Sequence, residues 1–150
     1  MTKWWLRAAL VFAQVPAGHA EMKLSTLAEM KLSTLYTLHC SGCHGAAGHG
    51  APAAGIPDLG YAGSYVMLPQ GRAYLAQVPG ISQSRLDDAT AARMLNYVLM
   101  RFSAASLPAG FVPYSAAEVG QLRADKASDA ETRRAAVLAG LAALPAGPGR

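Results

Sequence analysis

Thiols and charges are scarce in this sequence. Only Cys40 and Cys43 carry a thiol in 150 residues, and charged residues make up 15% of the chain against 52% hydrophobic residues. A structural zinc site takes four ligands, so two cysteines would need His39, His44 or His49 crowded into the same loop. This disfavours a zinc site, although a redox-active dithiol stays open as an alternative. With so many apolar residues, the length allows one domain with its own core.

Sequence signatures for nucleotide and nucleic-acid binding are also missing. The formal net charge is +4, but Lys3 and Arg7 lie in a segment that we expect to be removed, which leaves eleven basic residues against nine acidic ones. Apart from Arg133 and Arg134, the basic residues are scattered and no aromatic residues alternate with them. We therefore expect no nucleic-acid partner. Without a nucleotide fingerprint, independent oxidation of a substrate is also disfavoured, and we expect a protein that is not an enzyme.

The feature that organises the chain is the pentapeptide Cys40-Ser41-Gly42-Cys43-His44. Two thiols two residues apart can add to the two vinyl groups of one porphyrin, and the next residue then places an imidazole beneath the iron. The spacing C-x-x-C-H is typical of a c-type haem attachment site. It predicts one covalently bound haem c held by Cys40 and Cys43, with His44 as the proximal iron ligand. No second motif of this kind occurs.

The first twenty residues have the organisation of a secretory signal peptide. A basic start precedes a short apolar stretch and small residues, and we expect cleavage after Ala20. An uncleaved membrane anchor is the alternative, but spanning a bilayer takes about 20 apolar residues. Here Arg7, Gln14 and Pro16 interrupt the run. We therefore expect export to the periplasm and no transmembrane anchor after cleavage, which suits a haem that is attached outside the inner membrane.

An eight-residue segment, AEMKLSTL, occurs twice in succession, at residues 20–27 and 28–35. Two copies are too few for a repeat architecture. The segment contains no Gly or Pro and is a good helix former. In the second copy Leu32 and Leu35, followed by Tyr36, form an apolar side that runs towards the haem motif. We expect the second copy to pack on the core and the first to be dispensable.

Residues 45–59 form a glycine-rich loop by composition. A Tyr four residues before C-x-x-C-H, Gly directly after the His, and the Pro57-Asp58-Leu59 segment a dozen residues on resemble the opening half of a class I cytochrome c. The resemblance implies an all-α fold around one haem, with residues 21–113 as the haem domain. It also implies that the Pro57 carbonyl accepts a hydrogen bond from His44. A ligand histidine generally uses its second ring nitrogen on such a fixed acceptor.

The sixth iron ligand departs from the pattern of that family. Its Met ligand lies in the loop before the closing helix, and the comparable stretch here, residues 77–84, contains no Met. Met67 is the best remaining candidate for the distal ligand, with a role in apolar packing as its alternative. We expect Met94 and Met100 to be core residues of the closing helix. If no Met binds, the iron is five-coordinate or takes a water molecule.

Two helices are predicted between the loop and the tail. Asp87 is a good N-cap for a helix over residues 88–102, where Ala91, Leu95 and Val98 follow the helical period. This segment resembles the closing helix of a class I cytochrome. A shorter helix is predicted over residues 72–78, stopped by Pro79-Gly80. Apolar residues before and within it are available to wall a haem pocket: Tyr61, Tyr65, Val66, Met67, Leu68, Tyr74 and Leu75.

Residues 114–150 form a predicted C-terminal helical extension that the minimal haem domain does not need. Capping boxes begin at Ser115 and at Ser128, each followed three residues later by Glu, and predict helices over residues 116–124 and 129–144. The extension could pack on the haem domain or present an apolar stripe to a partner. We favour packing.

Together these features predict an exported mono-haem cytochrome that carries single electrons between periplasmic redox proteins. A dehydrogenase would be the donor, and an oxidase or another cytochrome the acceptor. The competing interpretation is a haem protein with an open distal site that binds a small gas or has weak peroxidase activity. A third is a haem subunit whose C-terminal helices dock permanently in a larger complex.

Overall fold

The computed structural model describes residue 29, residues 31–125 and residues 129–145. The predicted signal peptide over residues 1–20 and the first copy of the octad, residues 20–27, lie outside these residues. In the described part every regular element is a helix, and the one β-bridge, between Ala51 and Ile56, is isolated. The prediction of an all-α fold is confirmed.

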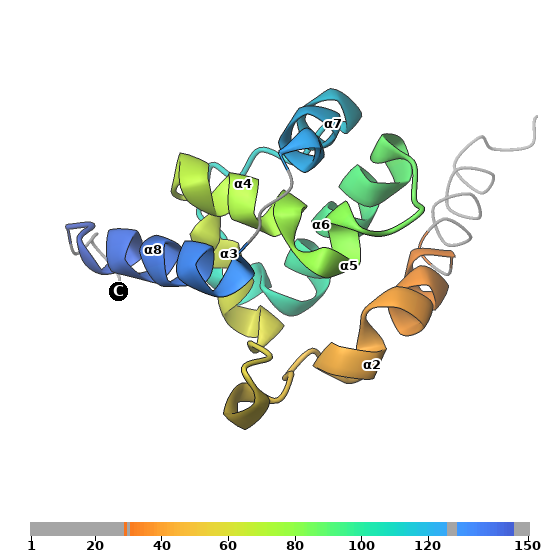
Figure 1. The fold of residues 1–150 in the computed structure, drawn as a ribbon, viewed down its shortest axis with the longest axis horizontal. Coiled ribbons are helices and arrows are strands. Elements are labelled where there is room, and N and C mark those ends of the chain that lie inside the picture. Colours follow the sequence, from red (N-terminus) through yellow and green to blue (C-terminus); the bar gives the residue numbers. More distant parts are fainter. Residues whose placement is uncertain (1–28, 30, 126–128, 146–150) are drawn as a thin grey trace, which may run out of the picture.

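The segment with the predicted haem motif and the C-terminal helix α8 lie on opposite sides of the molecule, with the other helices between them (Figure 1). A helix over residues 31–39 leads into the motif. The labelled elements are α2 (Ser41–His44), η1 (Pro52–Ala54), η2 (Leu59–Tyr61), α3 (Ala62–Tyr65), α4 (Pro69–Gln77), α5 (Pro79–Ser82), α6 (Asp88–Phe102), η3 (Ala104–Ser106), α7 (Ala116–Ala124) and α8 (Ala130–Ala142).

Helix α6 is the central packing element, and its bounds are those predicted. The Asp87 carboxylate accepts a hydrogen bond of 2.7 Å from the Thr90 amide, which satisfies one of the free donors at the helix start. Its apolar positions recur with the helical period, so one side of the helix is buried: Ala91, Ala92, Met94, Leu95 and Leu99.

The helix that delivers the motif packs against the end of α6 through Tyr36 and Phe102. The two ring centroids lie 4.7 Å apart. Gly48 also approaches the Phe102 ring: its φ is +79°, and a Cβ there would lie 2.8 Å from that ring. Tyr36 also donates a hydrogen bond of 2.7 Å to the Gly45 carbonyl. One tyrosine therefore joins the helix before the motif, the loop after it and α6.

Helix α4 differs from the prediction at both ends. It begins at Pro69, three residues earlier than expected, because proline is favoured at the first helical position, where no N–H is needed. It ends at Gln77, since Val78 is extended before Pro79. We expected Pro79 only to end the preceding helix. It is also the first residue of the short helix α5.

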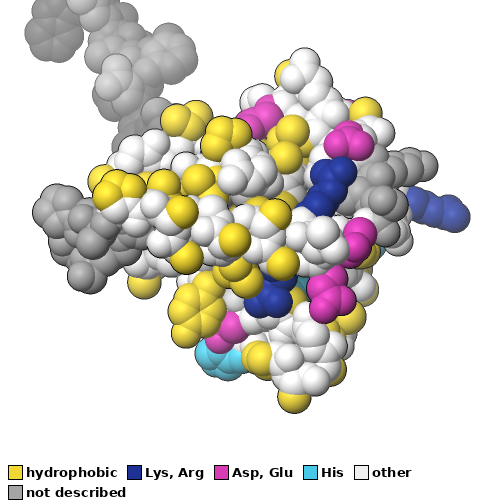
Figure 2. All heavy atoms as spheres, turned by 60° about the vertical axis from the view of Figure 1, so that its left-hand side comes forward, with side chains coloured by type: hydrophobic (Ala, Val, Ile, Leu, Met, Phe, Trp, Pro, Cys, Tyr) yellow, Lys and Arg dark blue, Asp and Glu magenta, His cyan; other side chains and the backbone are white. Residues whose placement is uncertain are grey.

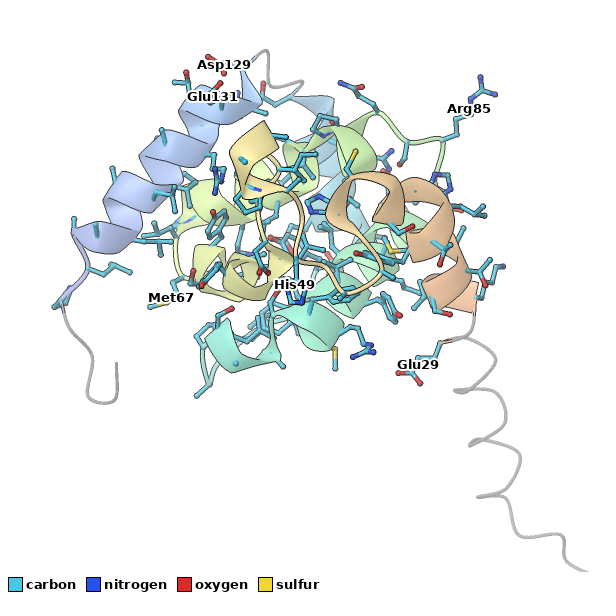
Figure 3. The ribbon with its side chains drawn as sticks, turned by 90° about the horizontal axis from the view of Figure 1, so that it is seen from below. Glu29, His49, Met67, Arg85, Asp129 and Glu131 are labelled. Carbon is cyan, nitrogen blue, oxygen red and sulfur yellow. The ribbon has the colours of Figure 1, made fainter. Side chains whose placement is uncertain are left out.

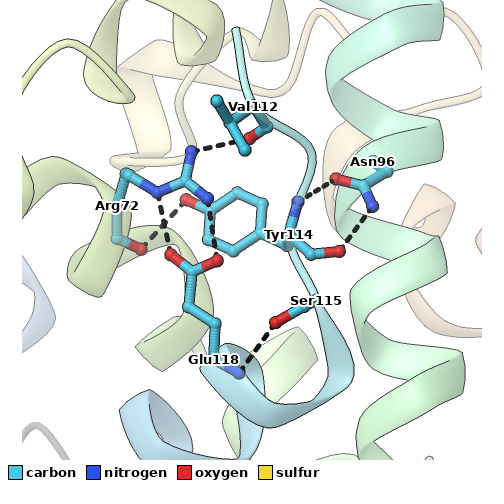
Figure 4. Close-up of polar contacts among 6 residues, drawn as sticks. All are labelled: Arg72, Asn96, Val112, Tyr114, Ser115 and Glu118. Atoms are coloured by element: carbon cyan, nitrogen blue, oxygen red, sulfur yellow. Dashed lines mark hydrogen bonds and ion pairs between the residues drawn. The ribbon is translucent and has the colours of Figure 1, made fainter.

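Helix α7 is held to α4 and α6 by a polar network centred on Arg72 and Tyr114 (Figure 4). Arg72 donates from Nε and Nη2 to the two Glu118 carboxylate oxygens at 2.8 and 2.9 Å, and from Nη1 to the Val112 carbonyl at 2.9 Å. Its guanidinium lies 4.1 Å from the centre of the Tyr114 ring, whose hydroxyl donates to the Arg72 carbonyl.

Helix α6 is joined to the same segment through Asn96. The Asn96 side chain donates to the Tyr114 carbonyl and accepts from the Tyr114 amide. The Ser115 cap of α7 is confirmed.

Helix α8 packs on α3 and α4, so this part of the predicted extension lies against the helices that precede it in the chain. Close approach occurs at Gly140, where a Cβ would lie 2.9 Å from Leu68. At the other end, Arg133 hydrogen-bonds the buried side chain of Gln77. The predicted start was wrong by one residue. The N-cap is Asp129, whose carboxylate accepts from the Thr132 amide, and the helix ends at Ala142 rather than Leu144.

Charges on the surface are mixed in sign. On the face shown in Figure 2, acidic and basic side chains are interspersed and no single basic patch forms. Among the described residues, no helix is long and apolar enough to cross a membrane.

Candidate haem site

The three reactive side chains of the motif lie on one side of a helical turn. The backbone follows a helix to residue 39, and Cys40 then acts as the N-cap of α2, with the His44 amide donating to its carbonyl at 2.9 Å. Positions i, i+3 and i+4 share one face of a helix. Cys40, Cys43 and His44 consequently all line the same cavity.

The structure places the imidazole of His44 against the carbonyl oxygen of Pro57. The distance from Nδ1 to that oxygen is 3.1 Å. A ring nitrogen that donates to a carbonyl leaves the other nitrogen, Nε2, with its lone pair available for a metal. The fold thus brings together the predicted iron ligand, His44, and the carbonyl predicted to orient it, that of Pro57, which are thirteen residues apart in the sequence.

Backbone hydrogen bonds within the glycine-rich loop hold the Pro57 carbonyl in place. Gly50 donates to the His44 carbonyl at 2.9 Å, and Ala51 and Ile56 exchange two hydrogen bonds of 3.0 and 3.1 Å. Gly50 has a φ of +65°, and a Cβ at this position would overlap the Pro57 carbonyl oxygen and lie 2.7 Å from that of Ile56. Only glycine permits this approach without strain.

Both cysteine thiols are free. Cys40 is half-buried and Cys43 is exposed. Burial, and to a lesser extent the neighbouring Cys43 thiol, raises the pKa of the Cys40 thiol. The two thiols therefore differ in exposure to solvent: Cys40 is the more buried of the two, and Cys43 lies where the cavity meets solvent.

The cavity has a volume of about 410 Å³ and an apolar lining. Besides the motif, the lining comes from the loop at residues 55–59, from α3, α4, α5 and α6, and from Ala130 of α8. The side chains that contribute from these helices are mostly aliphatic or aromatic: Ala62, Tyr65, Tyr74, Leu75, Ile81, Leu95, Val98 and Leu99. Such a slot favours a large, flat, apolar group, which gains free energy by leaving water.

The structure separates Met67 from this cavity. Its side chain is 41% exposed, it is not among the lining residues, and it points away from the middle of the fold (Figure 3). Met94 is completely buried in α6 outside the lining, and Met100 is 64% exposed. Among the residues that the structure describes, no methionine lines the cavity.

The two other described histidines differ in position. His39 ends the helix before Cys40 and lines the cavity edge. His49 is exposed and contacts the Asp58 carboxylate at 3.3 Å. The Gly60 amide first, and His49 second, hold the pKa of the Asp58 carboxyl below its usual value. In the described part of the chain no group of three or more His, Cys, Asp or Glu side chains could hold a metal ion.

One buried polar atom gives an independent test of fit to haem. Arg134 Nε is buried and is the one such side-chain atom in the described residues without a hydrogen-bond partner. Arg134 is not itself a lining residue, but it follows the lining residue Ala130 by about one helical turn, and its charge acts on the hydroxyl of Tyr74, another lining residue. An unpaired buried donor is costly, and a carboxylate is its strongest acceptor. Haem carries two propionates, so the donor set and the cavity fit this group.

Part of the lining was not predicted from the sequence. Ile81 lies in what we expected to be a connection, and Ala130 lies in the extension. The Pro79 that opens α5 was a usable signal for Ile81. An alanine carries no comparable signal, since its place in the cavity depends on how α8 packs.

Comparison with known proteins finds relatives that are similar in sequence to this chain. The chain is 30% identical over 118 residues to a cytochrome c-552 of Thermus thermophilus, an alignment covering 67% of this chain and 79% of the relative. A second cytochrome c-552 of Thermus thermophilus is 31% identical over 105 residues, covering 58% of this chain and 80% of the relative. No family model matches, and no solved structure matches. With the motif geometry and the all-α fold, these relatives show that the chain belongs to the cytochrome c family.

Proposed function

We propose that this protein is an exported mono-haem cytochrome c that carries single electrons between periplasmic redox proteins. Membership of the cytochrome c family implies a haem c cofactor. One observation carries the proposal for this chain: Cys40, Cys43 and the Pro57-bound His44 line a single apolar cavity. Haem, when bound, supplies reversible one-electron chemistry, while the protein provides binding, orientation and electrostatics.

Each motif residue has a separate part in this function. The thiols of Cys40 and Cys43 form the thioether bonds, and His44 Nε2 is the proximal ligand. The Pro57 carbonyl keeps the imidazole in one orientation and one tautomer, which strengthens its donation to a metal. The aliphatic lining from α5 and α6 excludes water and so lowers the local dielectric around the site.

Electrons would cross at the edge of the cavity beside Cys43. This cysteine is exposed, whereas Cys40 and the α6 side of the cavity are more deeply buried. Electron-transfer encounters are transient and use small interfaces. A dehydrogenase as donor, and an oxidase or another cytochrome as acceptor, would meet the chain at this edge.

Voltammetry of the purified holoprotein tests the proposal. We expect a reversible wave that transfers one electron per haem. The His49→Ala variant is the matched control, because His49 lies in the same loop but is exposed, and its imidazole pairs with the Asp58 carboxylate and not with the motif. It should keep the wave. A wave that is irreversible in both proteins would contradict the carrier function.

Export is tested separately from electron transfer. The protein should accumulate in the periplasmic fraction with Glu21 as its first residue, because the signal peptide is expected to be cleaved after Ala20. N-terminal sequencing of the haem-containing protein measures this. A mature chain that still begins at Met1 and sediments with membranes would contradict it.

A second candidate function is binding of a small gas, or weak peroxidase activity, at an open iron. The observation that favours it is the absence of methionine from the described lining of the cavity.

A further inference from the structure

The side chains around the cavity leave few candidates for a sixth iron ligand. Apart from the motif, the described lining residues with a ligating atom are His39, Asp58, Tyr65 and Tyr74. His39 directly precedes Cys40 at the end of the helix over residues 31–39, so its position is tied to that of the motif. The Asp58 oxygens are engaged by the Gly60 amide at 2.7 Å and by His49 at 3.3 Å.

The two tyrosines are better suited to wall the cavity than to bind iron. Their rings pack at a centroid distance of 5.9 Å. Binding of iron by tyrosine needs the phenolate. Burial, with a smaller contribution from Tyr65, raises the pKa of the Tyr74 hydroxyl above its ordinary value, against a smaller lowering effect of Arg134. Tyr74 therefore stays a neutral phenol near neutral pH.

The connection between α5 and α6 is short and fixed. It comprises residues 83–87 and directly follows α5, which with it covers most of residues 77–84, the stretch that the family resemblance compares with the Met-bearing loop. Ser84 Oγ donates to the Ile81 carbonyl at 2.8 Å. Arg123 of α7 donates to the carbonyls of Leu86 and Ser84 at 3.0 and 3.1 Å. These bonds hold the connection against α7, and none of residues 83–87 is among the lining residues of the cavity.

The methionines of the described chain are also fixed outside the cavity. Met94 and Met100 belong to α6, whose contributions to the described lining are Leu95, Val98 and Leu99, and neither methionine is among the lining residues. Met67 follows α3 with its side chain 41% exposed, and its amide is bonded to the Ser64 carbonyl at 3.1 Å.

We propose that this chain leaves the sixth coordination position of its haem iron open, as a binding site for a small neutral diatomic molecule. The lining explains the choice of ligand class. It is apolar, its one carboxylate is already paired, and no Lys or Arg side chain is among the described lining residues. Arg134, which lies beside the lining, is the proposed partner of a haem propionate, so an anion would lose its hydration in the cavity without gaining a free partner, whereas a neutral diatomic molecule loses little. The proposal rests on covalent haem attachment through Cys40 and Cys43 with His44 as proximal ligand.

The test uses the purified full-length holoprotein and carbon monoxide as the probe. A pyridine haemochrome spectrum is recorded first, because it reports thioether-bound haem. Without that signature the haem assignment fails, and the ligand-binding proposal fails with it. With the signature present, we expect a high-spin or water-ligated spectrum and a prompt, saturable Soret shift when carbon monoxide is added to the reduced protein. A low-spin spectrum that carbon monoxide leaves unchanged would overturn the open site while leaving the electron carrier intact.

Two methionine variants sharpen the result. Met67→Leu and the control Met100→Leu change exposed thioethers that are similar in chemistry. We expect both to show the wild-type spectrum and carbon monoxide affinity within about twofold. If Met67→Leu alone converts a low-spin spectrum to one that responds to carbon monoxide, Met67 is the ligand and the proposal is wrong. Comparison with cyanide added to the oxidised protein tests the ligand class: cyanide binding without any carbon monoxide response would overturn the neutral-ligand assignment.

Discussion

The His44 imidazole and the Pro57 carbonyl are joined by a contact of 3.1 Å, and Gly50 is the residue that makes room for it. Because Gly50 lacks a Cβ, the loop can fold back until the Pro57 carbonyl lies directly over it. The orientation of the proposed iron ligand therefore depends on a residue six positions further along the chain that is not among the lining residues of the cavity.

The Gly50→Ala variant should weaken this contact. Its Cβ would overlap the Pro57 carbonyl oxygen, and its φ of +65° adds strain of about 1–2 kcal/mol for a residue with a side chain. With its acceptor displaced, His44 donates less electron density to iron. We expect a weaker iron–histidine bond, seen as a lower stretching frequency by resonance Raman spectroscopy of the reduced protein, and a higher reduction potential.

Gly55→Ala is the control for that variant. Gly55 also has a positive φ, +76°, but a Cβ there would meet no protein atom within 4 Å. It should lose similar stability from backbone strain and keep the iron–histidine frequency. Equal frequency shifts in both variants would show that the effect comes from loop strain and not from the Pro57 carbonyl.

The bidentate pair of Arg72 and Glu118 should hold α7 to α4. Glu118→Gln removes the charge and one strong acceptor from a pair whose side chains are only 20% and 32% exposed. We expect a loss of about 1–2 kcal/mol in the free energy of unfolding. Urea denaturation of the holoprotein measures it.

The same chemical change at exposed Glu131 serves as the comparison. Glu131→Gln should change the free energy of unfolding by less than about 0.5 kcal/mol. If the two variants lose equal stability, the Arg72–Glu118 pair contributes nothing beyond an ordinary surface charge.

Three aspartates should make the protein sensitive to acid. The amide of Gly60 lowers the pKa of Asp58, the Thr90 backbone and side chain lower that of Asp87, and the Thr132 side chain and backbone lower that of Asp129. A carboxyl whose folded pKa is depressed stabilises the fold above its unfolded pKa, and this stability is lost as the pH falls through the folded pKa. The thermal midpoint of the holoprotein should therefore fall as the pH drops below about 4.

An Asp87→Asn variant separates charge from capping. The amide oxygen of Asn can still accept the hydrogen bond from the Thr90 amide, but it has no carboxyl to titrate. Its thermal midpoint should fall less on acidification than that of the wild type, whereas Glu29→Gln, at an exposed position, should follow the wild type. Identical pH profiles for all three proteins would rule out Asp87 as a contributor.

Deletion of residues 21–27 should leave haem binding intact. The second octad copy is followed by Tyr36, which is buried, and itself supplies Leu32 and Leu35, which pack against the core. The haem content per polypeptide measures the outcome. Loss of holoprotein in this deletion, with the signal peptide retained, would show that the first copy is needed.

The sequence predicted a helix well where a capping residue directly precedes the helical segment. The Asp87 cap and the bounds of α6 are confirmed, as are the Ser115 cap and the bounds of α7, because each depends on residues within one or two helical turns. The start of α4 was missed because Pro69 was not interpreted as the first residue of a helix, and α5 was missed because Pro79 was interpreted only as a stop signal.

The cavity was only partly predictable. The motif gives Cys40, Cys43 and His44 by chemistry alone, and the wall residues Tyr65, Tyr74 and Leu75 were expected. In contrast, nothing local to Met67 shows that its side chain points outward, and nothing local to Ala130 shows that it reaches the cavity. The place of Ala130 depends on the packing of α8 against α3 and α4, which brings together residues far apart in the sequence.

The most direct test of the central claim asks whether haem is bonded to Cys40 and Cys43. The holoprotein, made in cells that mature c-type cytochromes, is denatured in acid and extracted with an organic solvent, and its intact mass is measured beside that of a Cys40→Ala/Cys43→Ala variant. The account predicts that one haem stays with the wild-type polypeptide and none with the variant. Haem that extracts completely from the wild-type protein, or a wild-type mass equal to that of the bare chain, would contradict it.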